Sequence, residues 1–106
     1  MKLITAIINK QDAPEVCFAL TDNGFYFTKL ATTGGFLSAK NITLLMGVED
    51  ERVEEALEII RKRCTKRKEI VPTTLHHAPT PMTFPAEVIV GGATVFVTDV
   101  EHFEKM

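Results

Sequence analysis

Short apolar runs alternate with amphipathic stretches along the chain, in an order typical of a mixed α and β domain. Residues 2–9 are rich in β-branched side chains and predict a first strand. Residues 12–24 begin with an N-capping aspartate, place apolar residues on one helical face and end at a glycine, so they predict a helix. Residues 25–32 and 41–48 are again apolar or β-branched, and they predict the second and third strands.

A second amphipathic helix is predicted from Asp50, which we expect to cap it, to Cys64. Its outer face is charged, and its last turn holds three cations, which favourably meet the negative end of the helix dipole. We interpret the basic run through Lys68 as a solvated helix terminus rather than a phosphate site. Residues 65–84 lose periodicity and contain three of the five prolines. They predict a long loop, and such loops are usually binding elements or lids.

The C-terminal part of the chain predicts a hairpin. Two strand-like runs, residues 86–90 and 93–97, flank Gly91 and Gly92, and a two-residue connection of this kind is typical of a tight turn. The charged tail from Val100 onward predicts a last short helical turn.

The order strand, helix, strand, strand, helix, strand predicts an α+β fold of the ferredoxin-like βαββαβ type. Both helices would then lie on one face of an antiparallel sheet. Residues 44–46 and 95–97 are consecutive apolar positions, so these strands present apolar side chains to both faces of the sheet. We therefore expect a second subunit to cover the face that the helices leave bare.

Length and charge narrow the classes of function. The 106 residues fit a single domain over residues 1–106. Twelve lysines and arginines against fourteen acids give a net charge of −2, which argues against a general binder of nucleic-acid polymers. The apolar runs are too short for a membrane helix and the N-terminus lacks signal-peptide features, so we expect a cytoplasmic protein without membrane insertion. Cys17 and Cys64 stand alone, which favours reduced thiols.

The sequence contains no arrangement typical of an active site. Periodicity brings together neither a serine, histidine and aspartate nor a cysteine and histidine, and His76 and His77 are adjacent in the predicted loop. We expect no catalytic residues, no metal ligands and no cofactor. A small phosphate-ester hydrolase is a hypothesis from the class of enzymes. The sequence offers neither the general base nor the metal site that such an enzyme needs.

The most unusual composition lies between Thr28 and Asn41. Gly34 and Gly35 allow backbone conformations in which N–H groups converge on an anion, and the ring of Phe36 can stack on a purine. The alternative is a simple turn in which the same ring contacts another subunit. A lysine at Walker A spacing is missing, so an ATPase loop is excluded.

Two segments, KLATTGGFL at residues 29–37 and VGGATVFV at residues 90–97, closely resemble the PII-like cyclic-di-AMP receptors of Gram-positive bacteria. The resemblance extends over essentially the whole chain. It implies a homotrimer of ferredoxin-like subunits whose sheets pack together at the centre, with ligand sites in the clefts between neighbours. It also implies a T-loop at about residues 33–40 and a B-loop at about residues 65–84.

The resemblance further implies which residues contact the ligand. Thr28 would lie in an adenine pocket, and two apolar residues of the T-loop would cover the ligand. The paired glycines before the last strand would let the backbone approach it. The residues assigned in this way are Tyr26, Thr28, Gly35, Phe36, Leu37, Asn41, Gly47, Gly91, Gly92 and Phe96.

The sequence departs from the family pattern at two positions of the expected pocket. Gly24 and Tyr26 stand where better-known receptors have an asparagine and an arginine that contact adenine and phosphate. Tyrosine can stack or donate one hydrogen bond, but it lacks the charge and the forked donors of arginine. Lys40 and Lys105 are candidates to restore a positive charge near a phosphate.

The sequence thus predicts a non-enzymatic signal-transduction protein. It would be a homotrimer that binds cyclic-di-AMP between subunits and changes its loop conformation for an unknown protein partner. The alternative is a divergent PII-like sensor of another nucleotide, or a regulator without a ligand, because Gly24 and Tyr26 change the expected contacts.

Overall fold

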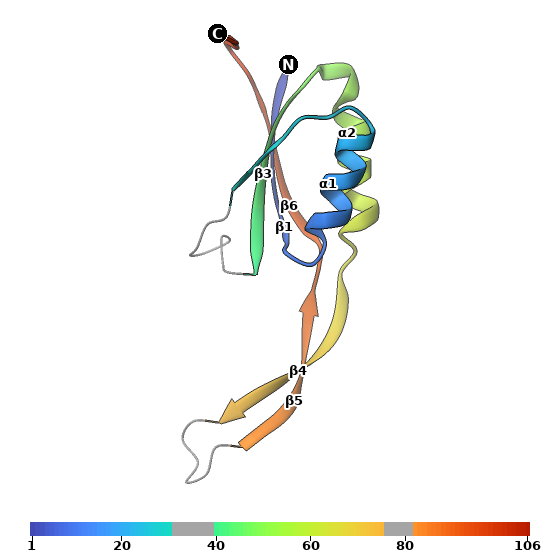
Figure 1. Cartoon of the computed structure of the whole chain (residues 1–106), viewed down its shortest axis with the longest axis vertical. Helices are drawn as coiled ribbons and strands as arrows, with labels where there is room; N and C mark the ends of the chain where they lie inside the picture. Colours follow the sequence, from blue (N-terminus) through green and yellow to red (C-terminus); the bar gives the residue numbers. More distant parts are fainter. Residues whose placement is uncertain (31–39, 76–81) are drawn as a thin grey trace.

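The computed structural model of the chain describes residues 1–30, 40–75 and 82–106 (Figure 1). Four strands form one sheet in the order β2-β3-β1-β6, and β4 pairs with β5 in a second sheet. Along the chain the elements are β1 (Lys2–Asn9), α1 (Ala13–Asp22), β2 (Thr28–Leu30), β3 (Asn41–Val48), a 3-10 turn (Asp50–Arg52), α2 (Val53–Arg63), β4 (Arg67–Leu75), β5 (Met82–Val90) and β6 (Ala93–Asp99).

The four-stranded sheet is antiparallel, and both helices lie against one of its faces (Figure 1). This arrangement is a small α+β fold compatible with the ferredoxin-like type. The strands predicted at residues 2–9 and 41–48 are confirmed with the same bounds. Their β-branched and apolar side chains suit a strand that packs beneath a helical layer.

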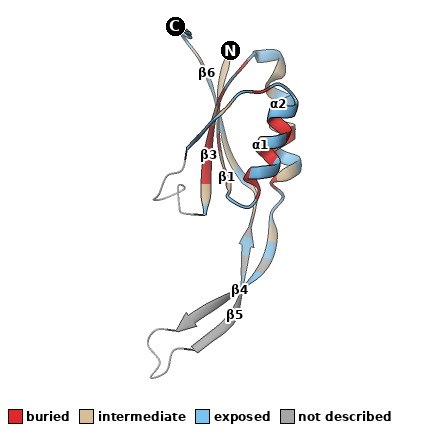
Figure 2. Cartoon of the chain, viewed as in Figure 1, coloured by how far each residue is buried: buried red, intermediate tan, exposed pale blue. Residues whose placement is uncertain are grey.

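The core lies between the sheet and the two helices, where Figure 2 shows the buried residues facing one another. Each helix buries one narrow apolar stripe and leaves its charged face to solvent, as its periodicity predicts. A fully buried isoleucine or leucine contributes about 1.5–3 kcal/mol through the apolar area removed from water. The largest fully buried side chains are Ile4, Ile8, Val16, Leu20, Leu44, Met46 and Ile60.

The second strand starts three residues later than predicted. Gly24 has a φ of 80° and turns the chain back beneath α1, where the N–H of Phe25 donates to the carbonyl of Leu20 at 2.9 Å. The ring of Phe25 is buried in the core, so these residues close the helix end rather than extend the sheet. β2 begins at Thr28, and its predicted end at residue 32 lies outside the described residues.

The two aspartates predicted as helix caps have other roles. Asp12 occupies the N-cap position of α1 but makes no capping hydrogen bond, and its Oδ1 accepts one from Arg67 instead. Asp50 begins the 3-10 turn, and α2 starts only at Val53. The predicted cap at Asp50 is therefore wrong, because a tight turn precedes the α-helix.

The long loop predicted for residues 65–84 is wrong over most of its length. β4 and β5 pair from Arg67 opposite Val90 to the far end of both strands, and they form an arm that projects from the sheet (Figure 1). Pro72 lies opposite Pro85 in this ladder. In a two-stranded sheet, every second N–H group of each strand points away from the partner strand. A proline at such a position removes no hydrogen bond between the strands. Residues 76–81, between the strands, lie outside the described part of the chain.

The predicted hairpin between residues 86–90 and 93–97 is also wrong. β5 pairs with β4, whereas β6 pairs with β1. Gly91 and Gly92 both have positive φ, at 85° and 76°, and they redirect the chain from the arm into the sheet. The paired glycines supply the required backbone freedom, but long-range pairing decides which strands they connect.

The helical turn predicted from Val100 onward is not formed. The N–H of Val100 donates to the carbonyl of Met1 at 3.3 Å, so the chain continues beside β1 for one more residue. The exposed tail then has no regular structure, because so short a helix gains little without packing. Within the described ranges, neither helix has the length and apolar character needed to cross a membrane.

Candidate ligand-binding site

The sheet face turned away from the helices, here called the open face, carries several of the predicted contact residues. Along β1, Ile4, Ala6 and Ile8 are buried under the helices, so the alternate residues Thr5 and Ile7 point to the open face. Directly opposed residues of neighbouring strands share a face. The pairing register therefore shows which residues of β2, β3 and β6 also lie on the open face.

One row of the open face joins two predicted contact residues. Thr28 lies opposite Leu45, Leu45 lies opposite Thr5, and Thr5 lies opposite Phe96. The Phe96 side chain is 51% exposed, and Thr28 is exposed as well. Three strand spacings separate the two ends of this row by about 14 Å. Thr28 and Phe96 thus share a face without touching.

Asn41 and Gly47 lie on the same face but at opposite ends of β3. Six residues of extended strand separate them by about 20 Å. Gly47 lies opposite Leu3, next to the row of Thr28, whereas Asn41 lies opposite Asn9 at the far end of the strand. One chain by itself therefore holds these predicted contacts in two separate groups.

The remaining predicted residues on the second strand and the T-loop are only partly described. Tyr26 precedes β2, and its side chain is 89% exposed. The predicted contacts Gly35, Phe36 and Leu37 lie outside the described residues, as does most of the predicted T-loop at residues 33–40. The contact roles of all these residues are untested predictions.

A hollow of about 200 Å³ brings three of the predicted residues together where β1, β3 and β6 meet the base of the arm. We call it the strand-end hollow. Asn41, Gly91 and Gly92 line it, and so do Asn9 and Lys66, which the sequence analysis did not identify. Lys66 belongs to the basic run interpreted as a helix terminus. Its position beyond the helix end, three residues after Arg63, was the signal in the sequence that could have identified it. The remaining lining residues are Ile7, Ala93 and Thr94.

An arginine and an aspartate hold the base of the arm beside this hollow. Arg67 Nη1 donates to Asp12 Oδ1 at 3.1 Å, and Arg67 Nη2 donates to Gln11 Oε1 at 3.2 Å. The Asp12 carboxylate is buried, and its Oδ2 has no hydrogen-bond partner in the described part of the chain. The pair ties the first residue of β4 to the turn between β1 and α1.

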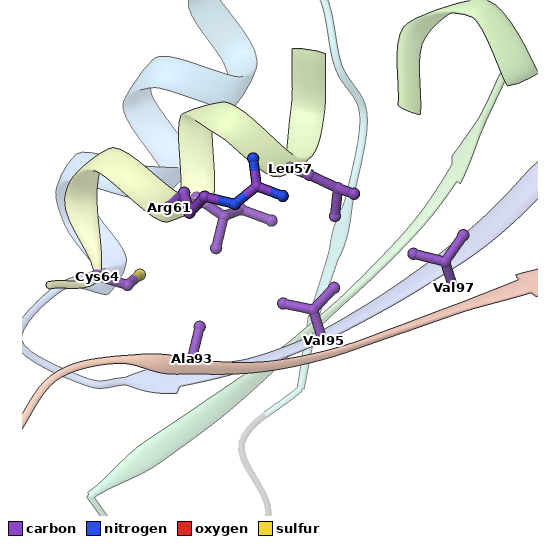
Figure 3. Close-up of a pocket in the computed structure, with 7 residues that line it drawn as sticks. Leu57, Arg61, Cys64, Ala93, Val95 and Val97 are labelled. Atoms are coloured by element: carbon purple, nitrogen blue, oxygen red, sulfur yellow. The ribbon is translucent and has the colours of Figure 1, made fainter. Parts of the chain in front are cut away.

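A larger hollow of about 410 Å³ lies between α2 and β6, on the helical side of the sheet (Figure 3). Its walls are mostly apolar, and none of the predicted contact residues lines it. Arg61 at its rim is engaged by Glu58 at 2.7 Å and Glu54 at 3.2 Å. Burial raises the pKa of the Cys64 thiol to about 11, so this cysteine is protonated at neutral pH. The lining of this hollow thus offers one charged group, which two glutamates already engage, and a protonated thiol.

The two lysines considered as replacement charges lie at different ends of the sheet. The carbonyl of Lys40 accepts a hydrogen bond from the N–H of Lys10 at 2.7 Å, so Lys40 lies at the end that holds Asn41. Lys105 lies in the C-terminal tail, which ends at the opposite end of the sheet (Figure 1). Of these two lysines, Lys40 is the one placed near the strand-end hollow.

Metal-ligating side chains do not gather in the ranges 1–30, 40–75 and 82–106. Among these residues, the structure contains no group of three or more histidines, cysteines and carboxylates that could hold an ion. His76 and His77 lie outside the described residues. The side-chain donors around the strand-end hollow are two amides, a hydroxyl and an ammonium group, which suit an anionic or hydrogen-bonding ligand.

Comparison with known proteins agrees with this architecture. The chain is similar to a functionally unknown protein from Pediococcus pentosaceus ATCC 25745, whose crystal structure is known. The two are 42% identical with a TM-score of 0.75, and the match covers 99% of this chain and 96% of that chain. The sequence model of the cyclic-di-AMP receptor family matches residues 1–106. The chain therefore belongs to the cyclic-di-AMP receptor family.

Proposed function

We propose that the protein is a non-enzymatic regulator that binds cyclic-di-AMP in the clefts between the subunits of a homotrimer. The observation that carries this proposal is the match of the receptor family to the whole chain. A cyclic dinucleotide offers two purine faces and two phosphates. Backbone groups, small polar side chains and aromatic rings bind such groups without a cofactor.

The open face supports the homotrimer. Leu3, Ile7 and Leu45 are only half-buried there, and Phe96 is exposed beside them. A small domain that leaves one apolar sheet face uncovered gains stability when copies of itself cover it. We propose that three copies pack these faces together around a common axis.

The spacing of the predicted contacts supports sites between subunits. Asn41 and Gly47 are about 20 Å apart along one strand, which is too far for a single purine with its phosphate to touch both. Two neighbouring chains can bring the Asn41 end of one protomer to the Gly47 end of the next. Each cleft would then take one group of contacts from each neighbour.

Ligand binding would change the arrangement of the predicted T-loop, residues 33–40, and of the predicted B-loop, residues 65–84. Both segments adjoin groups of predicted contacts, and the base of the second segment lines the strand-end hollow through Lys66. A ligand shifts the loops only if it binds one loop arrangement more tightly than another. A protein partner that recognises that arrangement would read out the bound state.

Mixing two variants tests whether each site is shared between chains. Asn41→Ala removes a contact of one group, and Gly47→Val blocks the other group with an added side chain. Gly47 tolerates a side chain within the protomer, because an added Cβ would meet only Met1 Sδ at 3.5 Å. Neither variant alone should bind cyclic-di-AMP. After joint unfolding and refolding, random assembly of cyclic trimers should restore about one quarter of the sites, counted by calorimetry.

The matched control mixes Asn41→Ala with the double variant Asn41→Ala, Gly47→Val. This mixture lacks every intact Asn41 and should restore no sites. Native mass spectrometry verifies that mixed trimers form in both cases. If mixed trimers form from the two single variants but no binding returns, each site belongs to one chain and the proposal of shared clefts is wrong.

A further inference from the structure

We propose that Lys66 binds a phosphate group of the ligand at the strand-end hollow, with the side-chain amide of Asn9 as a second donor. The inference rests on the proposed function and assigns the phosphate-binding end of the same site. The size of the hollow, the contact of the Lys66 stem with Gly92 and the charges nearby carry the argument.

The hollow is too small for a whole dinucleotide. Its volume of about 200 Å³ is below the roughly 300–1,000 Å³ of pockets that enclose drug-sized ligands. Its lining is largely polar, with the side chains of Asn9, Asn41 and Thr94 around the backbone of the two glycines. These features fit one phosphate group of a larger ligand that extends into the proposed cleft between neighbouring subunits.

Asn9 lines the hollow and can supply a second donor to a phosphate. Its Oδ1 already accepts the N–H of Gln11 at 2.8 Å, which fixes the orientation of the side-chain amide. The amide NH₂ group is thereby left as the donor at the hollow, where phosphate oxygens can accept its hydrogen bonds. Asn9 also lies directly opposite Asn41 in the sheet, so both amides stand at the same strand end.

Gly92 holds the stem of Lys66 against the wall of the hollow. A Cβ at Gly92 would lie 3.0 Å from Lys66 Cγ and 3.2 Å from its Cε. The stem of the lysine therefore runs close to the bare glycine backbone, while the residue stays exposed to solvent. Alanine at position 92 would push this stem away, and the φ of 76° would strain its backbone as well.

The charges at this end of the sheet favour an anion. The neighbouring Arg67 is already engaged by Asp12 and Gln11. Among the described residues, Lys66 pairs with no carboxylate. The same holds for Lys10 and Lys40, which meet through their backbones at the adjacent strand end. One unpaired ammonium group, that of Lys66, therefore lines the hollow, and two further lysines lie at the adjacent strand end. Positive charge in this region attracts phosphate.

The variant Lys66→Met tests the role of the ammonium group, because methionine keeps an unbranched stem and removes the charge. We expect the Kd for cyclic-di-AMP to rise about 10-fold to 100-fold, as is typical for the loss of a charge-assisted hydrogen bond. The residual binding should also weaken less with added salt than that of the wild type. Lys62→Met, on the exposed last turn of α2, is the matched control and should bind like the wild type. Unchanged affinity and salt dependence in Lys66→Met would overturn the inference.

Titration with inorganic phosphate separates this inference from the proposed function. Chemical shifts of the Gly91 and Gly92 amides and of the Asn9 side chain should move in the wild type and not in Lys66→Met. If these shifts move but cyclic-di-AMP does not bind, the hollow is an anion site and the proposed function is wrong. If cyclic-di-AMP binds equally to both proteins and phosphate moves no shifts, the Lys66 inference alone is wrong.

Discussion

Leu45→Lys is expected to turn the trimer into a folded monomer that no longer binds cyclic-di-AMP. Leu45 lies near the middle of the open face, between Thr28 of β2 and Thr5 of β1, and it is only half-buried within its own chain. A lysine there leaves the protomer stable, because its ammonium group can reach water. Burying that charge between sheets costs several kcal/mol without a partner, and three copies would meet around the axis.

The control for this substitution is Phe18→Lys. Phe18 is 74% exposed on α1, so the change also replaces a large apolar residue with lysine but lies on the helical side of the protein. Sedimentation equilibrium should give the mass of one chain for Leu45→Lys and of three chains for Phe18→Lys, and both should keep the circular dichroism of the wild type. A trimeric Leu45→Lys would rule out the open face as the interface.

Gly91→Ala is expected to lower the free energy of unfolding by about 2–5 kcal/mol, from left-handed backbone strain and overpacking together. Gly91 has a φ of 85°, and an added Cβ would lie 2.5 Å from the carbonyl oxygen of Thr65 and 2.8 Å from Arg67 Nη1. Neither group can retreat easily. One belongs to the backbone, and the other is held by Asp12.

Gly24→Ala is the matched comparison for this prediction. Gly24 has a similar φ of 80°, but an added Cβ would meet only Arg52 Nη1, at 3.8 Å. It should therefore cost only the backbone strain, about 1–2 kcal/mol. Urea unfolding at one fixed protein concentration measures both variants, since association affects apparent stability. Equal losses would show that the overlap at the base of the arm contributes nothing.

The part of the fold that the sequence predicted well is the part with a core beneath it. β1, β3 and the two helices have apolar residues on the face that they bury, and their periodicity reports that face directly. The described apolar side chains of the arm have no such core, because Ile70 and Ile89 are 76% and 69% exposed. Residues 65–84 show no periodicity, and the three prolines among them suggested a loop.

The pairing of β6 could not be predicted from local sequence. The two glycines before it are typical of a hairpin, but the partner of β6 is β1, at the other end of the chain. Lys66 was missed for a related reason. Its basic neighbours Arg61 and Arg63 do belong to the end of α2, where they bind Glu58 and the carbonyl of Ile59. Only the folded chain places Lys66 on the strand-end hollow.

Calorimetric titration of the protein with cyclic-di-AMP, alongside cyclic-di-GMP and ATP, tests the central claim most directly. The oligomeric mass is measured on the same sample by sedimentation. The account predicts selective binding of cyclic-di-AMP at about one ligand per chain to a particle of three chains. A folded trimer that binds none of the three nucleotides, or prefers another of them, would contradict the assignment of cyclic-di-AMP as its ligand.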